Sequence, residues 1–283
     1  MSDYSELYNK LNEKHEIKLR KNLCFWCDLL GFGGELLKNQ WILDENLIHQ
    51  KAERLTTAHK HFLMRTSPLN ESNLVLNDGL VKVSTISIKE HLDIWGFYIR
   101  NCIETHIFIK SIEQENNLPG CRSILSFGDS IEYITPEVKL DDYVAKYTKK
   151  NPNELSEVAK RTGNPTIVYN PIPFQMNTAF SKSYILDDLG KKYNIEGSNF
   201  YIDSSVLDFM ELIAKEKKIN LINKEISDTR IIYLEKVKDS AAYFGFELVN
   251  KNEIEYEGWN TFTYCVKSFY PPDENFTEFK YDL

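Results

Sequence analysis

The chain has 283 residues, a length that suits one large hydrophobic core or a core with an appendage. Hydrophobic residues make up 42% and charged residues 27%, values typical of an ordinary soluble protein, which excludes wholesale disorder. The formal net charge is −8 and no dense Lys/Arg stripe is present, which excludes a protein whose main partner is a nucleic-acid backbone.

The N-terminal segment is polar. Tyr8, Leu11 and Ile17 fall on one side of a helix, so residues 1–20 predict a lead-in helix. This segment has mixed charge instead of an apolar core, so it predicts no signal peptide. The longest apolar runs, such as residues 95–109, are interrupted by charged side chains and are unsuited to crossing a bilayer. We therefore expect a cytoplasmic protein without a membrane partner.

The first strong strand pattern covers residues 23–27 and runs directly into Asp28. A glycine-containing turn at residues 31–34 follows, and a helical pattern begins after Asp44, a suitable N-cap, and continues to residue 64. Cys24 and Cys27 have C-x-x-C spacing, but no second pair accompanies them, so we interpret them as small buried strand residues.

A hairpin is predicted over residues 74–85, because apolar residues flank the turn Asn77-Asp78-Gly79. A second long helix begins at the capping box of Ser87 and Glu90 and ends before Pro119. Strand patterns follow at residues 122–127 and 131–134. Further on, the sequence predicts helices over 176–189 and 204–217 and strands over 200–202 and 230–234.

The order strand, helix, hairpin, helix, strand is typical of a ferredoxin-like, split βαβ core, so we predict an α+β fold with an antiparallel sheet backed by helices. We expect residues 21–215 to form the catalytic domain and residues 216–283 to form a C-terminal extension packed on it.

Two carboxylates carry the predicted chemistry. Asp28 ends the first strand and Asp78 lies on the neighbouring hairpin, so antiparallel pairing can bring them side by side. Two such carboxylates repel each other unless hard cations such as Mg²⁺ or Mn²⁺ neutralise them. The adjoining turn, which includes Gly31, offers backbone N–H groups suited to phosphate oxygens. The sequence therefore predicts a metal-dependent site for a nucleoside triphosphate.

These motifs resemble those of class III nucleotidyl cyclases. FWCDLLGFG (25–33) resembles the family's F-x-D-[IV]-x-G-F signature, and VLNDGLV (75–81) resembles the segment of its second metal Asp, with Asn77 where the family has Gly. PGCRSILSFG (119–128) is similar to the strand after its second helix. The resemblance covers roughly residues 23–210, and the most similar subgroup is the bacterial Pycsar pyrimidine cyclases of antiphage defence.

NTAFSKSY (177–184) resembles the family's N-x-A-x-R helix, where Asn and Arg steady the reacting phosphate. Asn177 matches, whereas the Arg position falls on Ser181 with Lys182 adjacent. The purine-reading Lys and Asp of the family are Leu74 and Asn170 in this chain, which fits a smaller base.

The resemblance implies a homodimeric lyase that converts CTP or UTP to a cyclic monophosphate with two Mn²⁺ or Mg²⁺ ions. It implies that Asn177 and Lys182 act in catalysis, from the partner subunit. The implied metal ligands are Asp28, Leu29 and Asp78, and the implied substrate-binding residues are Trp26, Leu30, Gly31 and Phe32.

Three alternatives stay open at this point. Asp129, which follows Gly128, is a second choice for the second metal ligand. The missing Arg also fits a degenerate cyclase fold that senses nucleotides. A third reading is another two-metal nucleotidyl transferase on the same fold, because polymerase-like palms share the two-Asp geometry.

Overall fold

A computed structural model describes residues 16–65, 71–86, 92–134, 172–235, 242–272 and 280–283. The chain divides into two compact units, one of residues 1–19 and 131–176 and the other of residues 20–130 and 177–283. The second unit holds most of the described residues and the candidate site. No helix in the described ranges is long and apolar enough to span a membrane.

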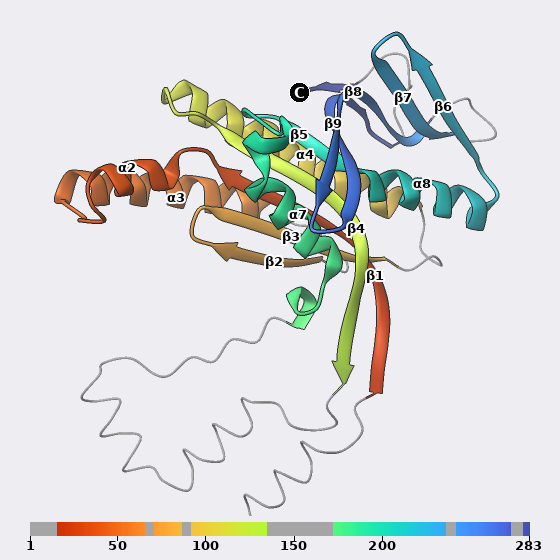
Figure 1. Cartoon of the computed structure of the whole chain (residues 1–283), viewed down its shortest axis with the longest axis horizontal. Coiled ribbons are helices and arrows are strands. Elements are labelled where there is room, and N and C mark those ends of the chain that lie inside the picture. Colours follow the sequence, from red (N-terminus) through yellow and green to blue (C-terminus); the bar gives the residue numbers. More distant parts are fainter. Residues whose placement is uncertain (1–15, 66–70, 87–91, 135–171, 236–241, 273–279) are drawn as a thin grey trace, which may run out of the picture. The chain divides into compact units, whose positions relative to one another are not determined.

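The architecture is a ten-stranded sheet with helices packed against it (Figure 1), in the strand order β2-β3-β1-β4-β5-β9-β8-β7-β6, with β10 paired to β9. The strands are β1 (Glu16–Leu29), β2 (Glu71–Leu76), β3 (Gly79–Ile86), β4 (Cys121–Ile134), β5 (Phe200–Asp203), β6 (Asn220–Ile226), β7 (Thr229–Glu235), β8 (Ala242–Tyr256), β9 (Trp259–Tyr270) and β10 (Tyr281–Asp282). The α-helices are α2 (Phe32–Lys38), α3 (Glu45–Met64), α4 (Leu92–Glu115), α7 (Thr178–Asp188) and α8 (Ser204–Lys217), and two short 3₁₀ helices are η1 (Ile172–Phe174) and η2 (Gly190–Tyr193).

Antiparallel pairs dominate the sheet. β3 pairs antiparallel with both β1 and β2, and β9 pairs antiparallel with both β5 and β8, whereas β4 and β5 run parallel. The predicted hairpin is present, and Asn77 at its tip has a φ of 58°, which a two-residue turn of this kind requires. The predicted α+β fold class is confirmed.

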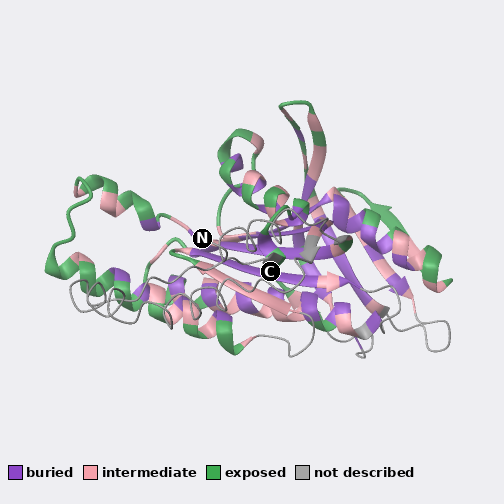
Figure 2. Cartoon of the chain, turned by 90° about the horizontal axis from the view of Figure 1, so that it is seen from below, coloured by how far each residue is buried: buried purple, intermediate pink, exposed green. Residues whose placement is uncertain are grey.

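The two faces of the sheet follow from alternation along β1. Phe25, Cys27 and Leu29 belong to the main core, together with Phe62 of α3 and Trp95 of α4. The β1 residues that alternate with these three point to the other face of the sheet, where α7 packs. Figure 2 shows the buried residues concentrated along the strands and the exposed ones on the outer surfaces of the helices.

Residues after the predicted domain boundary add strands to the same sheet. β6 and β7 form one hairpin, and β8 and β9 form a longer one, with Glu257 at φ 48° and Gly258 at φ 83° in its turn. Sequence patterns predicted only residues 230–234 of these strands, and residues 216–283 were assigned to a C-terminal extension. The predicted division at residue 215 stays a prediction.

The predicted N-terminal helix is wrong for Glu16–Arg20, because these residues begin β1. The physical reason is visible in the sequence: Glu16, Lys18 and Arg20 alternate with Ile17 and Leu19, a period of two that favours a strand. Residues 1–15, the rest of the predicted helix, lie outside the described residues. Asn170 lies outside them as well.

Candidate functional site

Asp28 and Asp78 lie on neighbouring chain segments at one end of the sheet. In the register of β1 and β3, Asp28 is opposite Gly79, the residue directly after Asp78. The backbone N–H of Leu29 donates a hydrogen bond to the carbonyl oxygen of Asp78 at 3.3 Å. The fold therefore brings together the two acidic residues that the sequence singles out.

The electrostatics around Asp28 fit a cation site. The pKa of the Asp28 carboxyl is raised to about 7, first by burial and then by the negative charges of Asp187 and Asp78, which together outweigh the opposing effect of Arg122 and Arg54. Two carboxylates in one partly buried place are stable only when protonated or beside a cation. Carboxylate oxygens, with a backbone carbonyl such as that of Leu29, are the donors that Mg²⁺ and Mn²⁺ prefer. The residues present therefore fit a hard divalent cation.

No cluster of three or more His, Cys, Asp or Glu side chains with metal-binding geometry occurs among the described residues. The carboxylates proposed to hold a cation are those of Asp28 and Asp78. The side chain of Leu29 is buried, so only its carbonyl oxygen could serve as a ligand.

Asp187 and Arg122 are members of the site that sequence reasoning missed. The indole N–H of Trp26 donates to Oδ2 of Asp187 at 3.1 Å, and Nη2 of Arg122 donates to the backbone oxygen of Asp187 at 2.7 Å. Arg122 also forms an ion pair with the Asp187 carboxylate. The sequence gives one hint of this contact: Trp26 shares a strand face with Asp28, and a buried indole N–H needs a hydrogen-bond acceptor. No local sequence pattern identifies Asp187 as that acceptor.

Two positively charged side chains of α3 contact the glycine-containing turn. Nη2 of Arg54 donates to the carbonyl oxygen of Leu30 at 2.8 Å, and Nζ of Lys51 lies 4.6 Å from the centre of the Phe32 ring. Gly31 has a φ of 71°, a conformation that glycine adopts without strain. Phe32 is buried beneath the cations, so a substrate could reach only its backbone.

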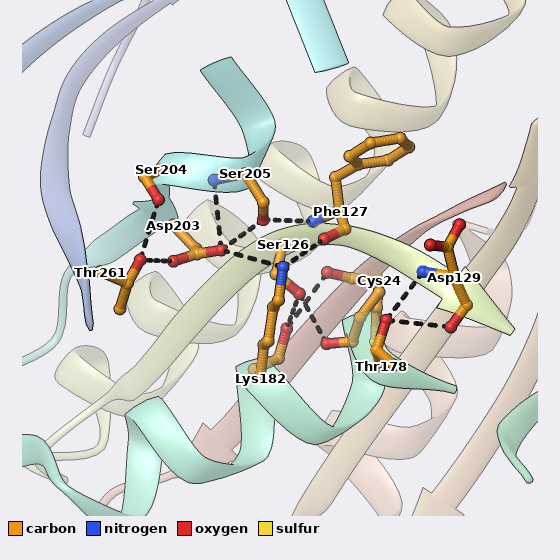
Figure 3. A network of polar contacts seen from close by, with 12 residues as sticks. Cys24, Ser126, Phe127, Asp129, Thr178, Lys182, Asp203, Ser204, Ser205 and Thr261 are labelled. Carbon is orange, nitrogen blue, oxygen red and sulfur yellow. Dashed lines mark hydrogen bonds and ion pairs between the residues drawn. The ribbon is translucent and has the colours of Figure 1, made fainter. Parts of the chain in front are cut away.

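Asn177 and Lys182 lie at the far end of the same sheet face. Asn177 caps α7 by accepting from the N–H of Phe180 at 3.0 Å, and Nζ of Lys182 donates to the carbonyl oxygen of Phe127 at 3.1 Å (Figure 3). Phe127 and Arg122 are five residues apart on β4, which is roughly 16 Å along a strand. Within one subunit, Lys182 is therefore separated from the Asp28 end of the site.

Asp129, the second choice for the metal ligand, also lies at this far end. Its carboxylate forms an ion pair with Lys21 at 2.7 Å, and its N–H donates to the hydroxyl of Thr178 at 2.7 Å. The structure thus brings Asp78 and not Asp129 beside Asp28.

Gly79→Ala is expected to disturb the site, because a Cβ at this position would lie 2.6 Å from Cη2 of Trp26. The ring is packed against Tyr184 and bonded to Asp187, so it has little room to move. We expect a loss of about 1 to 3 kcal/mol in the free energy of unfolding, measured by urea denaturation. Gly33→Ala is the matched control, since no atom lies within 4 Å of its added Cβ. Equal stabilities for the two variants would contradict this packing.

Comparisons with known proteins return structures only. No protein-family model matches the sequence, and no curated protein matches it. Solved structures similar to the chain include the adenylyl cyclase CyaB from P. aeruginosa, with 13% identity, a TM-score of 0.39, and coverage of 89% of this chain and 95% of that chain. The guanylyl cyclase Cya2 has 8% identity, a TM-score of 0.44, and coverage of 88% and 93%. The dimeric guanylyl cyclase domain of the RhoGC fusion protein from the aquatic fungus Blastocladiella emersonii has 10% identity, a TM-score of 0.41, and coverage of 89% and 97%.

Proposed function

We propose that the chain is a nucleotide cyclase that converts CTP or UTP to the 3′,5′-cyclic monophosphate and pyrophosphate. The observation that carries the proposal is the juxtaposition of Asp28 and Asp78 beside a glycine-containing turn, with the pKa of Asp28 raised to about 7. The resemblance of FWCDLLGFG and VLNDGLV to the cyclase metal motifs supports the same reading.

The reaction joins the ribose 3′-oxygen to the α-phosphorus and breaks the bond from that phosphorus to pyrophosphate. Asp28, Asp78 and the carbonyl oxygen of Leu29 would hold two Mg²⁺ or Mn²⁺ ions, which supply charge stabilisation of the triphosphate and a lowered pKa of the 3′-hydroxyl. The turn at Gly31 and Phe32 would bind phosphate oxygens through its N–H groups, whereas the N–H of Leu30 donates to the carbonyl oxygen of Gly120 at 2.9 Å. Trp26 lies two residues before Asp28 on the same face of β1, where its buried indole packs against Tyr184 of α7.

A homodimer would complete the site. Asn177 caps the N-terminus of α7, and the ammonium of Lys182, the fifth residue of the helix, reaches the carbonyl oxygen of Phe127. Asp28 lies near the other end of α7, where Asp187 bonds to Trp26. The ammonium of Lys182 is bonded at Phe127 and Asp187 is bonded at Arg122, two positions on β4 that are about 16 Å apart along the strand. In such a homodimer, a two-fold axis would bring the Lys182 ammonium of one subunit against the Asp28 end of the other.

The proposed substrate is a pyrimidine nucleotide because Leu74 stands where a purine-reading lysine is expected from the resemblance. Leu74 is a half-buried residue of β2, opposite Val81. An aliphatic side chain supplies no hydrogen bond to a purine edge. The proposed role of the product is a second messenger in antiphage defence, in a cytoplasmic setting.

The test is incubation of the purified chain with Mn²⁺ and each of the four nucleoside triphosphates, followed by mass analysis. We expect cyclic CMP or cyclic UMP with pyrophosphate, at a rate at least about tenfold above that with ATP or GTP. Asp28→Ala should lower the rate by about 10³-fold, since both charge stabilisation and metal binding are lost. Asp208→Ala, an exposed position on α8, is the matched control and should retain the rate.

Two other outcomes identify other functions. Stabilisation by CTP or UTP without any product would support a nucleotide sensor, which the absence of Arg at Ser181 favours. A linked dinucleotide in the mass spectrum would support a two-metal nucleotidyl transferase. Unchanged turnover in Asp28→Ala would overturn the cyclase proposal.

A further inference from the structure

Lys182 belongs to a polar network between α7, β4 and the start of α8 (Figure 3). Its ammonium donates to the carbonyl oxygen of Phe127 at 3.1 Å and lies 4.0 Å from Oδ2 of Asp203. The lysine side chain is 29% exposed, whereas the Asp203 side chain is 1% exposed. A fixed, buried carboxylate thus faces a partly exposed ammonium.

Asp203 is held in place without the lysine. Its Oδ1 accepts from the hydroxyl of Thr261 at 2.6 Å, and its Oδ2 accepts from the N–H of Ser205 at 3.2 Å and from the Ser205 hydroxyl. It is also the N-cap of α8, and its backbone pairs with Thr263 of β9. The hydrogen-bonding capacity of the carboxylate is therefore satisfied by its own neighbours, and its remaining effect on Lys182 is through charge.

The pair constrains Lys182 more than it constrains Asp203. An ammonium has three N–H groups; one is used by Phe127, and the separation of 4.0 Å from Asp203 is an ion-pair distance instead of a short hydrogen bond. A free lysine samples many rotamers on its four-carbon stem. Anchored at two points, Lys182 keeps its ammonium at the surface of α7 with donor capacity left over.

We propose that Asp203 is a positioning residue that holds the ammonium of Lys182 ready for the phosphate groups of a nucleotide bound to the partner subunit. This inference rests on the proposed function, in which Lys182 is the cation that stabilises the reacting phosphate. Pre-ordering that cation removes the entropy cost of fixing a long side chain when the transition state forms. The effect of Asp203 is therefore on kcat and not on KM.

The experiment is a double-mutant cycle on the full-length chain with Mn²⁺ and CTP or UTP. Asp203→Ser removes the charge but keeps an N-cap residue at α8. We expect Lys182→Met to lower kcat by about 100-fold and Asp203→Ser to lower it by about tenfold with KM within about twofold. In the Lys182→Met background, Asp203→Ser should have no further effect, because its action passes through the lysine.

Thr261→Val is the matched control, because it removes a hydrogen bond to Asp203 and leaves the charge. It should retain most of kcat. Asp203→Asn, which also caps a helix, replaces Asp203→Ser in the cycle if the serine variant does not fold.

The outcomes separate the two proposals. An equal loss of kcat from Asp203→Ser in both backgrounds would show a purely structural role and overturn the positioning inference while the cyclase proposal stands. Full activity in Lys182→Met would likewise overturn the positioning inference alone. A wild-type chain that makes no cyclic product would overturn both.

Discussion

Asp28→Asn is expected to raise the midpoint temperature of unfolding by about 2 to 6 °C at about pH 8.5 without divalent cations, and to change it much less at about pH 4.5. Burial, then Asp187 and Asp78, raise the pKa of Asp28 from 3.8 to about 7 in the folded chain. Between these values the folded chain keeps a proton that the unfolded chain has released. Stability therefore falls as the pH rises from about 4 to about 7, and the ionised carboxylate costs most above that range.

The size of this stability difference follows from the same pKa shift of Asp28. A shift of about three pKa units corresponds to about 4 kcal/mol as an upper limit. Because Asp28 is partly exposed, solvent screening reduces this to about 1 to 2 kcal/mol, and a permanently neutral asparagine avoids it. Thermal unfolding of both proteins at the two pH values measures the difference.

Divalent cations should reverse the order of stability of the wild type and Asp28→Asn. Mn²⁺ is expected to raise the unfolding temperature of the wild type at about pH 8.5 but not that of Asp28→Asn, since the variant lacks a charged ligand. Turnover of CTP or UTP by the variant should fall by about 10³-fold. Asp208→Asn on the exposed surface of α8 serves as the control. A variant that is less stable than the wild type at both pH values would contradict the raised pKa.

Local sequence signals predicted the centre of the fold well. The turn Asn77-Asp78-Gly79 specified the β2–β3 hairpin, and the N-cap Asp44 accepts from the N–H of Leu47 at 2.9 Å as expected. The helix predicted over residues 204–217 coincides with α8 (Ser204–Lys217). These elements were predictable because each depends on residues close together in the sequence.

The elements that were missed depend on weaker turns or on competing periodicities. The β6–β7 hairpin turns at Ser227 and Asp228, and the β8–β9 hairpin turns at Glu257 and Gly258, which are less specific turn signals than Asn-Gly or Asp-Gly. The opening of β1 was predicted as part of a helix because Tyr8, Leu11 and Ile17 were interpreted as one helical face, and this longer pattern hid the five-residue alternation that favours a strand.

Only the part of the candidate site that depends on residues close together in the sequence was predictable. Asp28 and the glycine-containing turn share one segment, and the hairpin register then brings Asp78 to them. Asp187 meets Trp26 and Arg122 only because α7 packs across β1 and β4. Such a contact is set by tertiary packing, and no spacing or periodicity in the sequence encodes it.

Arg54→Met is expected to lower the free energy of unfolding by about 3 to 5 kcal/mol, since it leaves Glu113 as a buried charge without its partner. Nε of Arg54 lies 2.9 Å from each carboxylate oxygen of Glu113, and the two side chains are 4% and 5% exposed. Arg54 also holds the carbonyl oxygen of Leu30. Urea denaturation measures the loss, and the midpoint should fall without a change in slope.

The double variant Arg54→Met with Glu113→Leu should recover most of this loss, because removing both charges exchanges a buried ion pair for apolar packing. Lys51→Met is the matched control: Lys51 pairs with Glu35, whose side chain is 42% exposed, so its loss should cost about 1 kcal/mol or less. If the double variant recovers stability but not turnover, the role of Arg54 in turnover is its hydrogen bond to the turn at Leu30. A double variant as unstable as Arg54→Met would show that packing of the arginine stem, and not the unpaired charge of Glu113, causes the loss.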